Sequence, residues 1–341
     1  MEFVKRYWGL GIVYAIFFGW CAFTLSAILQ DNQGQFVYPL DDTYIHMAMA
    51  RHFAENGVWG LTPYAFSSST SSILWTLLLG IAYRLTGVHE LTPLVLSSII
   101  TIIWLGLSYV ILRHYKSSTL LAVVVGLLLI VFVPASLLFF LGMEHSLHAL
   151  LSLAYVWLVA LRLERNTPTR WEAVLAALLV MTRYEALFLI AAGCGLWLLR
   201  RQWRHSLLVG FSAALPVIVY GLISIANGWE FLPASILLRS GASVWLEQGS
   251  ALLSSNLAGL LRNTPTRALL LPLLLCLLAY SLRYSQAKKF WDAPSLMCLL
   301  VIGVTLLHVM FARVGWFGRY EAYLFVCGLT VGSAALFTTF P

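Results

Sequence analysis

The sequence predicts an all-α membrane protein, a polytopic transmembrane helical bundle with about ten spans. Of its 341 residues, 60% are hydrophobic and only 10% are charged, whereas soluble domains carry roughly 25% charged residues. Several apolar runs reach the roughly 17–25 residues that cross a bilayer as a helix. Because backbone groups in lipid must be satisfied within the segment, these runs are expected to be helices. The runs are residues 7–29, 91–112, 120–141, 206–226, 293–312 and 322–340.

The net charge of +7 comes from short basic clusters that stand between the apolar runs. This distribution follows the positive-inside rule and marks cytoplasmic loops. It therefore argues for the lipid bilayer as partner and against nucleic acid. The five cysteines all lie within apolar stretches without CxxC spacing, which argues against a disulfide framework or a zinc site.

Basic residues also set the predicted orientation of the chain. Lys5 and Arg6 place the N-terminus in the cytoplasm, and the first apolar run is a retained helix because no small-residue cleavage site follows it. The run 73–83 is too short to span. Counting it as a span would put Arg113 and Lys116 outside, so we predict that it lies in the membrane interface.

Four further spans bring the total to ten. They are 147–163, the two short helices predicted within 171–199, and 268–282. On this map most acidic residues lie outside, which the positive-inside rule does not require. We therefore expect the chemistry on the extracytoplasmic face of a multi-pass protein of the cell inner (plasma) membrane. The chain is expected to form one domain over 1–341, with outer loops at 30–90 and 227–266. It ends directly after an apolar run, which leaves open whether a further C-terminal region follows.

The most distinctive local feature is the acidic pair Asp41-Asp42. It precedes an amphipathic stretch, 43–56, that ends at Gly57 and is typical of a helix lying along a membrane surface. One interpretation makes Asp42 an N-cap, a position where aspartate is preferred. One cap needs only one aspartate, however, and adjacent carboxylates repel. At least one of the two is therefore expected to be functional.

Two further acidic positions stand at the ends of apolar segments. Glu144 ends one of them, and an ionisable group at such depth is by default a functional hypothesis. His145 and His148 have the i,i+3 spacing that could share a metal, although this spacing alone is a weak signal. Arg183 and Glu185 stand between two short apolar segments, where they could simply pair with each other.

The outward arginines Arg239 and Arg319 oppose the charge rule. A guanidinium matches phosphate bidentately, so both are candidate phosphate ligands. The alternative is a snorkelling surface arginine. The hydroxyl-rich segment 67–72 predicts either a flexible loop or a set of contacts to sugar.

Taken in order, these segments resemble the GT-C superfamily of membrane glycosyltransferases. The likeness is greatest to the bacterial branch with the arabinofuranosyl-, mannosyl- and aminoarabinose transferases. It extends from position 41 to position 320. The segment around Trp75 and the Arg183 segment lack the family's prolines, and Ala234 replaces an asparagine. The matching segments are Asp41-Asp42-Thr43-Tyr44-Ile45, Ser69-Thr70-Ser71-Ser72-Ile73-Leu74-Trp75, Gly142-Met143-Glu144, Arg183-Tyr184-Glu185, Leu232-Pro233-Ala234-Ser235 with Arg239, and Gly318-Arg319-Tyr320.

The resemblance implies an inverting hexosyl- or pentosyltransferase that takes a sugar from a polyprenyl-phosphate donor. The acceptor would be a glycan, lipid or protein on the outer face. Asp41 and Asp42 would be catalytic, with Asp41 the preferred base, and the arginines would face the lipid phosphate. The remaining implied substrate-binding residues are Tyr44, Glu144, His145, Arg183, Glu185, Arg239, Arg319 and Tyr320.

The family requires no common cofactor. Some members bind a divalent metal and others do not, and here Asp42, Glu144 and His145 would be its ligands. The competing hypotheses are a transporter or lipid flippase without transferase chemistry, and a non-enzymatic scaffold or degenerate transferase. Transporters place charges at mid-membrane on broken helices and often show internal repeats. Here the charges gather at one face and no repeat is visible.

Overall fold

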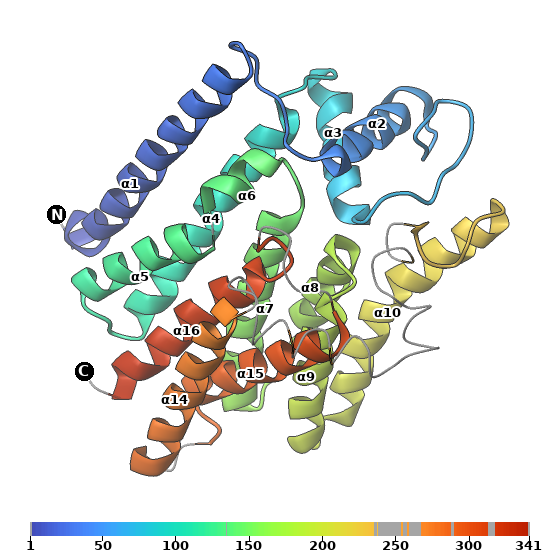
Figure 1. Ribbon diagram of the computed structural model, residues 1–341. Helices are drawn as coiled ribbons and strands as arrows, with labels where there is room; N and C mark the ends of the chain where they lie inside the picture. Colours follow the sequence, from blue (N-terminus) through green and yellow to red (C-terminus); the bar gives the residue numbers. More distant parts are fainter. Residues whose placement is uncertain are drawn as a thin grey trace.

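The computed structural model describes residues 2–133, 135–234, 267–287, 290–312 and 318–339, with the single positions 237, 254 and 258. Within these residues the chain is all-helical, as the sequence predicts, with thirteen helices and no strand (Figure 1). The helices are α1 (Glu2–Asp31), α2 (Asp41–Asn56), α3 (Ile73–Thr86), α4 (Thr92–His114), α5 (Thr119–Phe132), α6 (Ala135–Leu141), α7 (His145–Arg165), α8 (Arg170–Thr182), α9 (Ala186–Leu199), α10 (Trp203–Ala226), α14 (Leu270–Ala287), α15 (Ala293–Phe311) and α16 (Ala322–Thr339).

Six of the described helices are long and apolar enough to cross a membrane: α1, α4, α7, α10, α15 and α16. A seventh span results if the bent pair α5 and α6 is counted as one. Helices α3, α9 and α14 are apolar but shorter. The protein is therefore a multi-pass membrane protein by helix length and composition, although fewer than ten of its described helices reach spanning length.

The predicted run 120–141 is divided into α5 and α6. Pro134 stands between these helices in the sequence, and a proline inside a helix removes a backbone hydrogen bond and clashes with the preceding turn. The prediction of one unbroken helix over this run is therefore wrong. By contrast, the short helices predicted within 171–199 are present as α8 and α9.

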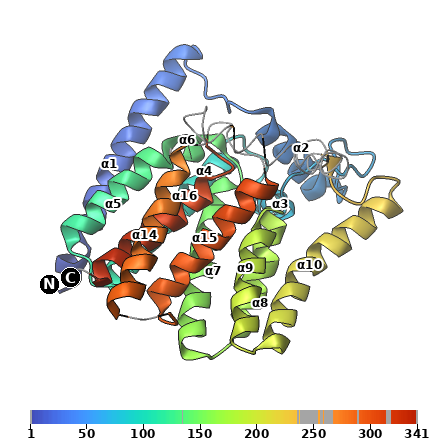
Figure 2. The same ribbon diagram turned by 60° about the horizontal axis from the view of Figure 1, so that its bottom comes forward.

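The helices run between two ends of one bundle (Figure 2). The α7–α8 and α9–α10 turns lie at the same end as both termini, and α2 and α3 lie at the other end. Exposed basic side chains mark the first end, among them Arg165, Arg170, Arg201 and Arg204. The bundle therefore separates a basic end from the end that carries the acidic pair.

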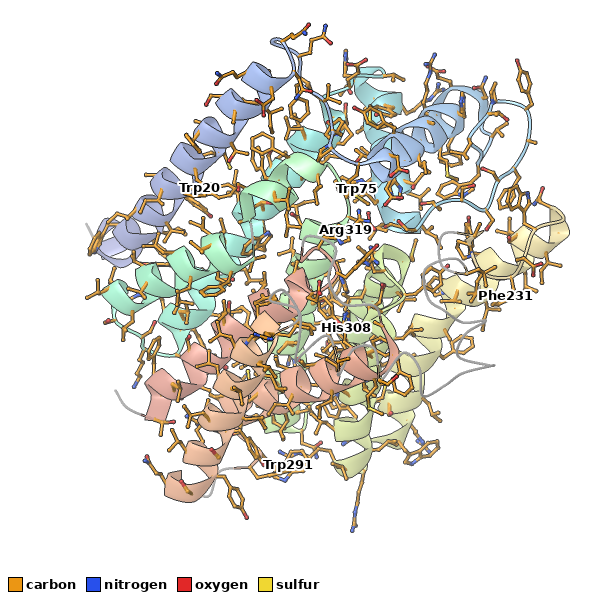
Figure 3. All side chains as sticks on the ribbon, viewed as in Figure 1. Trp20, Trp75, Phe231, Trp291, His308 and Arg319 are labelled. Carbon is orange, nitrogen blue, oxygen red and sulfur yellow. The ribbon has the colours of Figure 1, made fainter. Side chains whose placement is uncertain are left out.

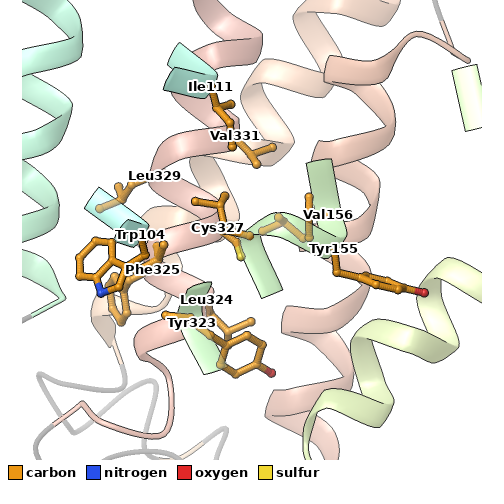
Figure 4. Close-up of a cluster of buried hydrophobic side chains, with 14 of the residues drawn as sticks. Trp104, Ile111, Tyr155, Val156, Tyr323, Leu324, Phe325, Cys327, Leu329 and Val331 are labelled. Atoms are coloured by element: carbon orange, nitrogen blue, oxygen red, sulfur yellow. The ribbon is translucent and has the colours of Figure 1, made fainter. Parts of the chain in front are cut away.

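Helix α16 is the most buried of the six long helices and packs against α14, α7, α15 and α4. Figure 4 shows part of this core, where Trp104 of α4 lies beside Phe325 of α16. Helix α1 is the least buried of the six and leaves most of its apolar surface outward, as expected of a helix that faces lipid.

The segment over residues 30–90 is held to the bundle by hydrogen bonds. Thr43 Oγ1 donates to the Leu141 carbonyl at 2.7 Å, and Trp75 Nε1 donates to the Gly142 carbonyl at 3.2 Å. Gly142 has a φ of +62°, and a Cβ there would meet Tyr38 at 2.6 Å. Glycine is therefore required where α2 and α3 meet the bundle.

Candidate functional site

The acidic pair lies in the first turn of α2. The helix begins at Asp41, and its N-cap is Leu40, which makes no side-chain cap. The interpretation of Asp42 as an N-cap is therefore wrong. The first turn nevertheless favours negative charge, because the free N–H groups of the helix point there. Asp41 is exposed and accepts a hydrogen bond from the Asp42 backbone N–H at 2.9 Å, whereas Asp42 is only 6% exposed.

Asp42 pairs with Arg319, a residue 277 positions later in the chain. Arg319 Nη2 lies 3.3 Å from Asp42 Oδ2, and Arg319 is 3% exposed. The same guanidinium contacts Met143 Sδ at 3.4 Å and donates to the Tyr320 hydroxyl at 3.1 Å. Figure 3 shows Arg319 in the interior, close to the end that holds Trp75. The segment before α16 thus reaches the start of α2.

A second buried network joins α7 to the α8–α9 corner. Arg183 Nη1 donates to Glu144 Oε1 at 2.8 Å, and Arg183 also holds Glu185 through two bonds of 2.7 and 3.2 Å. The predicted Arg183–Glu185 pairing is therefore present, and Arg183 pairs with Glu144 as well. Glu144 is fully buried, so Arg183 neutralises a carboxylate that has no access to solvent.

Tyr320 connects the two networks. The Cζ atoms of Arg183 and Arg319 lie 5.2 and 5.0 Å from its ring centroid, within cation–π range. The His145 ring lies 6.0 Å away in an edge-on arrangement. The structure thus brings together Asp42, Glu144, His145, Arg183, Glu185, Arg319 and Tyr320 from the predicted set.

His46 belongs to this site, although no single motif in the sequence marked it. Its Nδ1 lies 2.9 Å from Thr76 Oγ1, and its Nε2 lies 3.2 Å from Ser71 Oγ and 3.5 Å from Glu144 Oε2. Ser71 also donates to Glu144 Oε1 at 3.2 Å. The available signal was spacing, because His46 follows Asp42 by four residues and so lies on the same helical face.

The hydroxyl-rich segment 67–72 is packed into the site. All of its residues except Ser69 are buried, and Thr70 donates to the Ser72 carbonyl at 2.9 Å. The interpretation as a free polar loop is therefore wrong. These hydroxyls instead form a polar layer between α2 and Glu144.

The pKa values of Glu144 and Glu185 are both lowered. Burial opposes the charge on Glu144, but His145, His46 and Arg183 hold the pKa of this carboxyl well below its ordinary value. Burial likewise opposes the charge on Glu185, and Arg183 lowers its pKa to about 2. Both carboxyls therefore favour the charged form beside Arg183.

A polar stripe continues from Glu144 along α7. His145, His148, Ser152 and Tyr155 recur at helical spacing, and all are buried. Both ring nitrogens of His145 and Nε2 of His148 have no hydrogen-bond partner among the described residues. The inner side of the site is thus polar over roughly 15 Å, at 1.5 Å of rise per residue.

The possible metal ligands Asp42, Glu144 and His145 do not converge. Across the described ranges, no three His, Cys, Asp or Glu side chains form a group that could hold a metal ion. Asp42 and Glu144 are each paired with an arginine instead. The divalent metal therefore stays a prediction of the resemblance alone.

Two further predicted residues are not brought into this centre by the described structure. Tyr44 is exposed, and its hydroxyl accepts a hydrogen bond from the Tyr38 backbone N–H at 3.0 Å. Arg239 lies outside the described residues. Earlier in the same loop, the Ala234 N–H donates to the Ser68 carbonyl at 2.9 Å. Ala234 thus lies against the hydroxyl-rich segment.

Fold and site together define an all-helical, multi-pass membrane protein with two buried acid–arginine networks at one end of its bundle. Comparison with family models, curated proteins and solved structures finds no match to the chain. Its function is therefore argued from the chemistry of the site.

Proposed function

We propose that the chain is an inverting membrane glycosyltransferase that moves a sugar from a polyprenyl-phosphate donor to an acceptor hydroxyl. The observation that carries this proposal is the position of Asp41. It is an exposed carboxylate at a helix start, directly beside a buried network of arginines and carboxylates. An accessible base beside fixed positive charge suits the attack of a hydroxyl on a sugar phosphate.

The chemistry divides between the two aspartates. Asp41 takes the proton of the acceptor hydroxyl as its oxygen forms the new bond to the anomeric carbon. The bond to the lipid phosphate breaks on the opposite face, which inverts that carbon, and the phosphate leaves without a proton. Asp42 forms an ion pair with Arg319, with Oδ2 and Nη2 3.3 Å apart. Its role is therefore to position this arginine.

The arginines supply the positive charge that the leaving phosphate needs. Charge grows on the phosphate as the bond breaks, and a preorganised guanidinium stabilises it. Arg319 is the best placed, because it contacts Asp42 and Tyr320 at once. Arg239 is the second candidate from the sequence. His145, Arg183, Glu144 and Glu185 form the wall behind the reacting centre, and Tyr44 lies at its outer edge.

An apolar groove next to the acidic pair suits the prenyl chain of the donor. It has a volume of about 430 Å³ and lies between α1, α6 and the segment that leads into α2. Tyr38 and Pro39 line it immediately before the helix that carries the aspartates, and Phe140 lines it from α6. A lipid lying there would bring its phosphate toward Asp41 and Arg319.

The proposal includes a topology of ten spans, with α2 and α3 in the outer interface and the N-terminus in the cytoplasm of an inner-membrane protein. Thr86 is exposed at the end of α3. A Thr86→Cys variant in intact cells is expected to react with an impermeant thiol reagent. Arg204→Cys, at the opposite end of the bundle, is expected to react only after lysis. If Thr86→Cys also needs lysis, α3 spans the membrane and the ten-span map fails.

A transfer assay tests the proposed activity. The purified protein is given polyprenyl-phosphate sugars from lipid extracts together with cell-envelope acceptors. Wild type is expected to transfer sugar, and a variant with both Asp41→Asn and Asp42→Asn is expected to show none. Glu55→Gln, which removes an exposed carboxylate from the same helix, is the matched control and should transfer like wild type. Transport of the lipid without any sugar transfer, equal in all three proteins, would favour a flippase instead.

A further inference from the structure

A second apolar groove lies between α8 and α10 and has a volume of about 640 Å³. Small side chains create it. Ala173 and Ala177 stand four residues apart on α8, and Ser212 and Pro216 stand four residues apart on α10. Residues four apart share one helical face, so each helix has a row of small side chains on the face that lines the groove. Longer apolar side chains form the walls, from Val174 and Leu178 on α8 and Leu208 and Leu215 on α10.

The mouth of this groove lies at the basic end of the bundle, away from the candidate site. Arg170 lines it in the first turn of α8. From there the groove follows α8 for about two turns, roughly 12 Å at 1.5 Å of rise per residue. Its length and apolar lining suit a hydrocarbon chain lying along the helices.

Charged and aromatic side chains stand in the first turns of α8 and α10, at the same end as Arg170. Trp171 and Trp203 are 67% and 54% exposed, and each stands next to an exposed arginine, Arg170 and Arg204 respectively. Arg204 also lies over the Trp203 ring, with Cζ 5.2 Å from its centroid. Tryptophan and arginine together are the composition that membrane proteins place at the level of the lipid headgroups.

Glu172 stands next to these residues in the sequence, but it does not neutralise the arginines at the surface. Glu172 is fully buried and lies 3.0 Å from His205 Nε2, and it accepts a hydrogen bond from Trp197 Nε1 at 2.7 Å. These contacts also fasten the start of α10 to the start of α8. Both helices thus begin at the mouth, where their N-termini add partial positive charge.

From the groove, its arginines and its tryptophans, we propose that the α8–α10 groove binds an anionic glycerophospholipid. One acyl chain lies along the small side chains, and the phosphate sits at Arg170 with Arg204 beside it. A basic pocket between transmembrane helices is a recognised form of headgroup site. This proposal does not depend on the proposed transferase activity, because the groove is at the opposite end of the bundle.

Native mass spectrometry of the purified protein tests the site. The protein is incubated with phosphatidylglycerol or phosphatidylcholine, and retained lipid is counted for each variant. Wild type is expected to retain phosphatidylglycerol more strongly, and Arg170→Gln is expected to weaken its binding about fivefold, since a basic residue near the headgroup contributes about 1 kcal/mol. Ala177→Phe fills the groove and is expected to remove the bound lipid.

Arg165→Gln is the matched control, because Arg165 is an exposed arginine at the same end that does not line the groove. It should bind phosphatidylglycerol like wild type. Equal retention of the two lipids by wild type would overturn the proposal, and so would an equal loss in Arg165→Gln and Arg170→Gln. Arg170 is exposed, so its replacement is expected to leave the fold intact, and a thermal melt of each variant verifies this.

Discussion

Replacing Arg183 with methionine is expected to lower the free energy of unfolding by roughly 3–5 kcal/mol, the usual cost of removing one partner from a buried ion pair. Arg183 is 4% exposed and holds both Glu144 and Glu185. Without it, the fully buried Glu144 and the partly buried Glu185 lose their countercharge, and burying an unpaired charge is strongly unfavourable. The measurement is reversible denaturation in mixed micelles, followed by circular dichroism.

Arg51→Met is the matched control. Arg51 pairs with Glu55 on the surface of α2, with side chains 56% and 43% exposed, and such pairs contribute about 0–1 kcal/mol. If Arg183→Met costs no more than Arg51→Met, the two glutamates are not held as ions by Arg183. Adding Glu144→Gln to Arg183→Met is expected to recover part of the loss, because it removes one uncompensated charge.

The cost of Arg183→Met is also expected to depend on pH. In wild type the pKa values of Glu144 and Glu185 are lowered in the folded state. Their contribution to the free energy of unfolding is therefore complete above the unfolded pKa of about 4.3. It is lost as pH falls through the pKa values of the folded state. Without Arg183 the burial of Glu185 is no longer offset, so the pKa of Glu185 rises and the variant instead loses stability as pH rises. The difference in the free energy of unfolding between wild type and Arg183→Met should therefore shrink from pH 7 to pH 4.

The long helices follow from the apolar runs, because the length of a run and the need to satisfy the backbone in lipid leave few alternatives. The predicted runs 91–112 and 206–226 correspond to α4 and α10 within a few residues. The break between α5 and α6 was missed, although a proline inside an apolar run was a visible signal.

The pairings within the site were harder to predict. Arg183–Glu185 is local and was expected, whereas Arg183–Glu144 joins residues 39 positions apart and Asp42–Arg319 joins residues 277 apart. No local pattern specifies which buried acid meets which arginine, since that depends on how the helices pack. The burial of His46 follows from the same packing, because α3 and the hydroxyl-rich segment cover one face of α2.

Replacing Asp41 or Asp42 with asparagine is expected to affect sugar transfer and stability in different ways. Asp41→Asn should lower the rate of sugar transfer by about 10²–10⁴-fold, the usual contribution of a general base. Asparagine keeps the oxygen that accepts the Asp42 N–H, but it cannot take up a proton. Because Asp41 is exposed, the melting temperature should stay within experimental error of wild type. The measurement is kcat from initial rates at saturating donor.

Asp42→Asn is expected to act through Arg319 instead. It leaves a buried guanidinium without its carboxylate, at a cost of roughly 3–5 kcal/mol, and the arginine loses the contact that positions it toward the phosphate. Asp42→Asn should therefore lower both stability and transfer, and adding Arg319→Gln should restore stability without restoring transfer. The assignment of Asp41 as the base fails if Asp41→Asn transfers sugar at the wild-type rate. In that case Asp42 would have to exchange its arginine for the acceptor hydroxyl during the reaction, and Arg319 rather than Asp41 would set the geometry of attack.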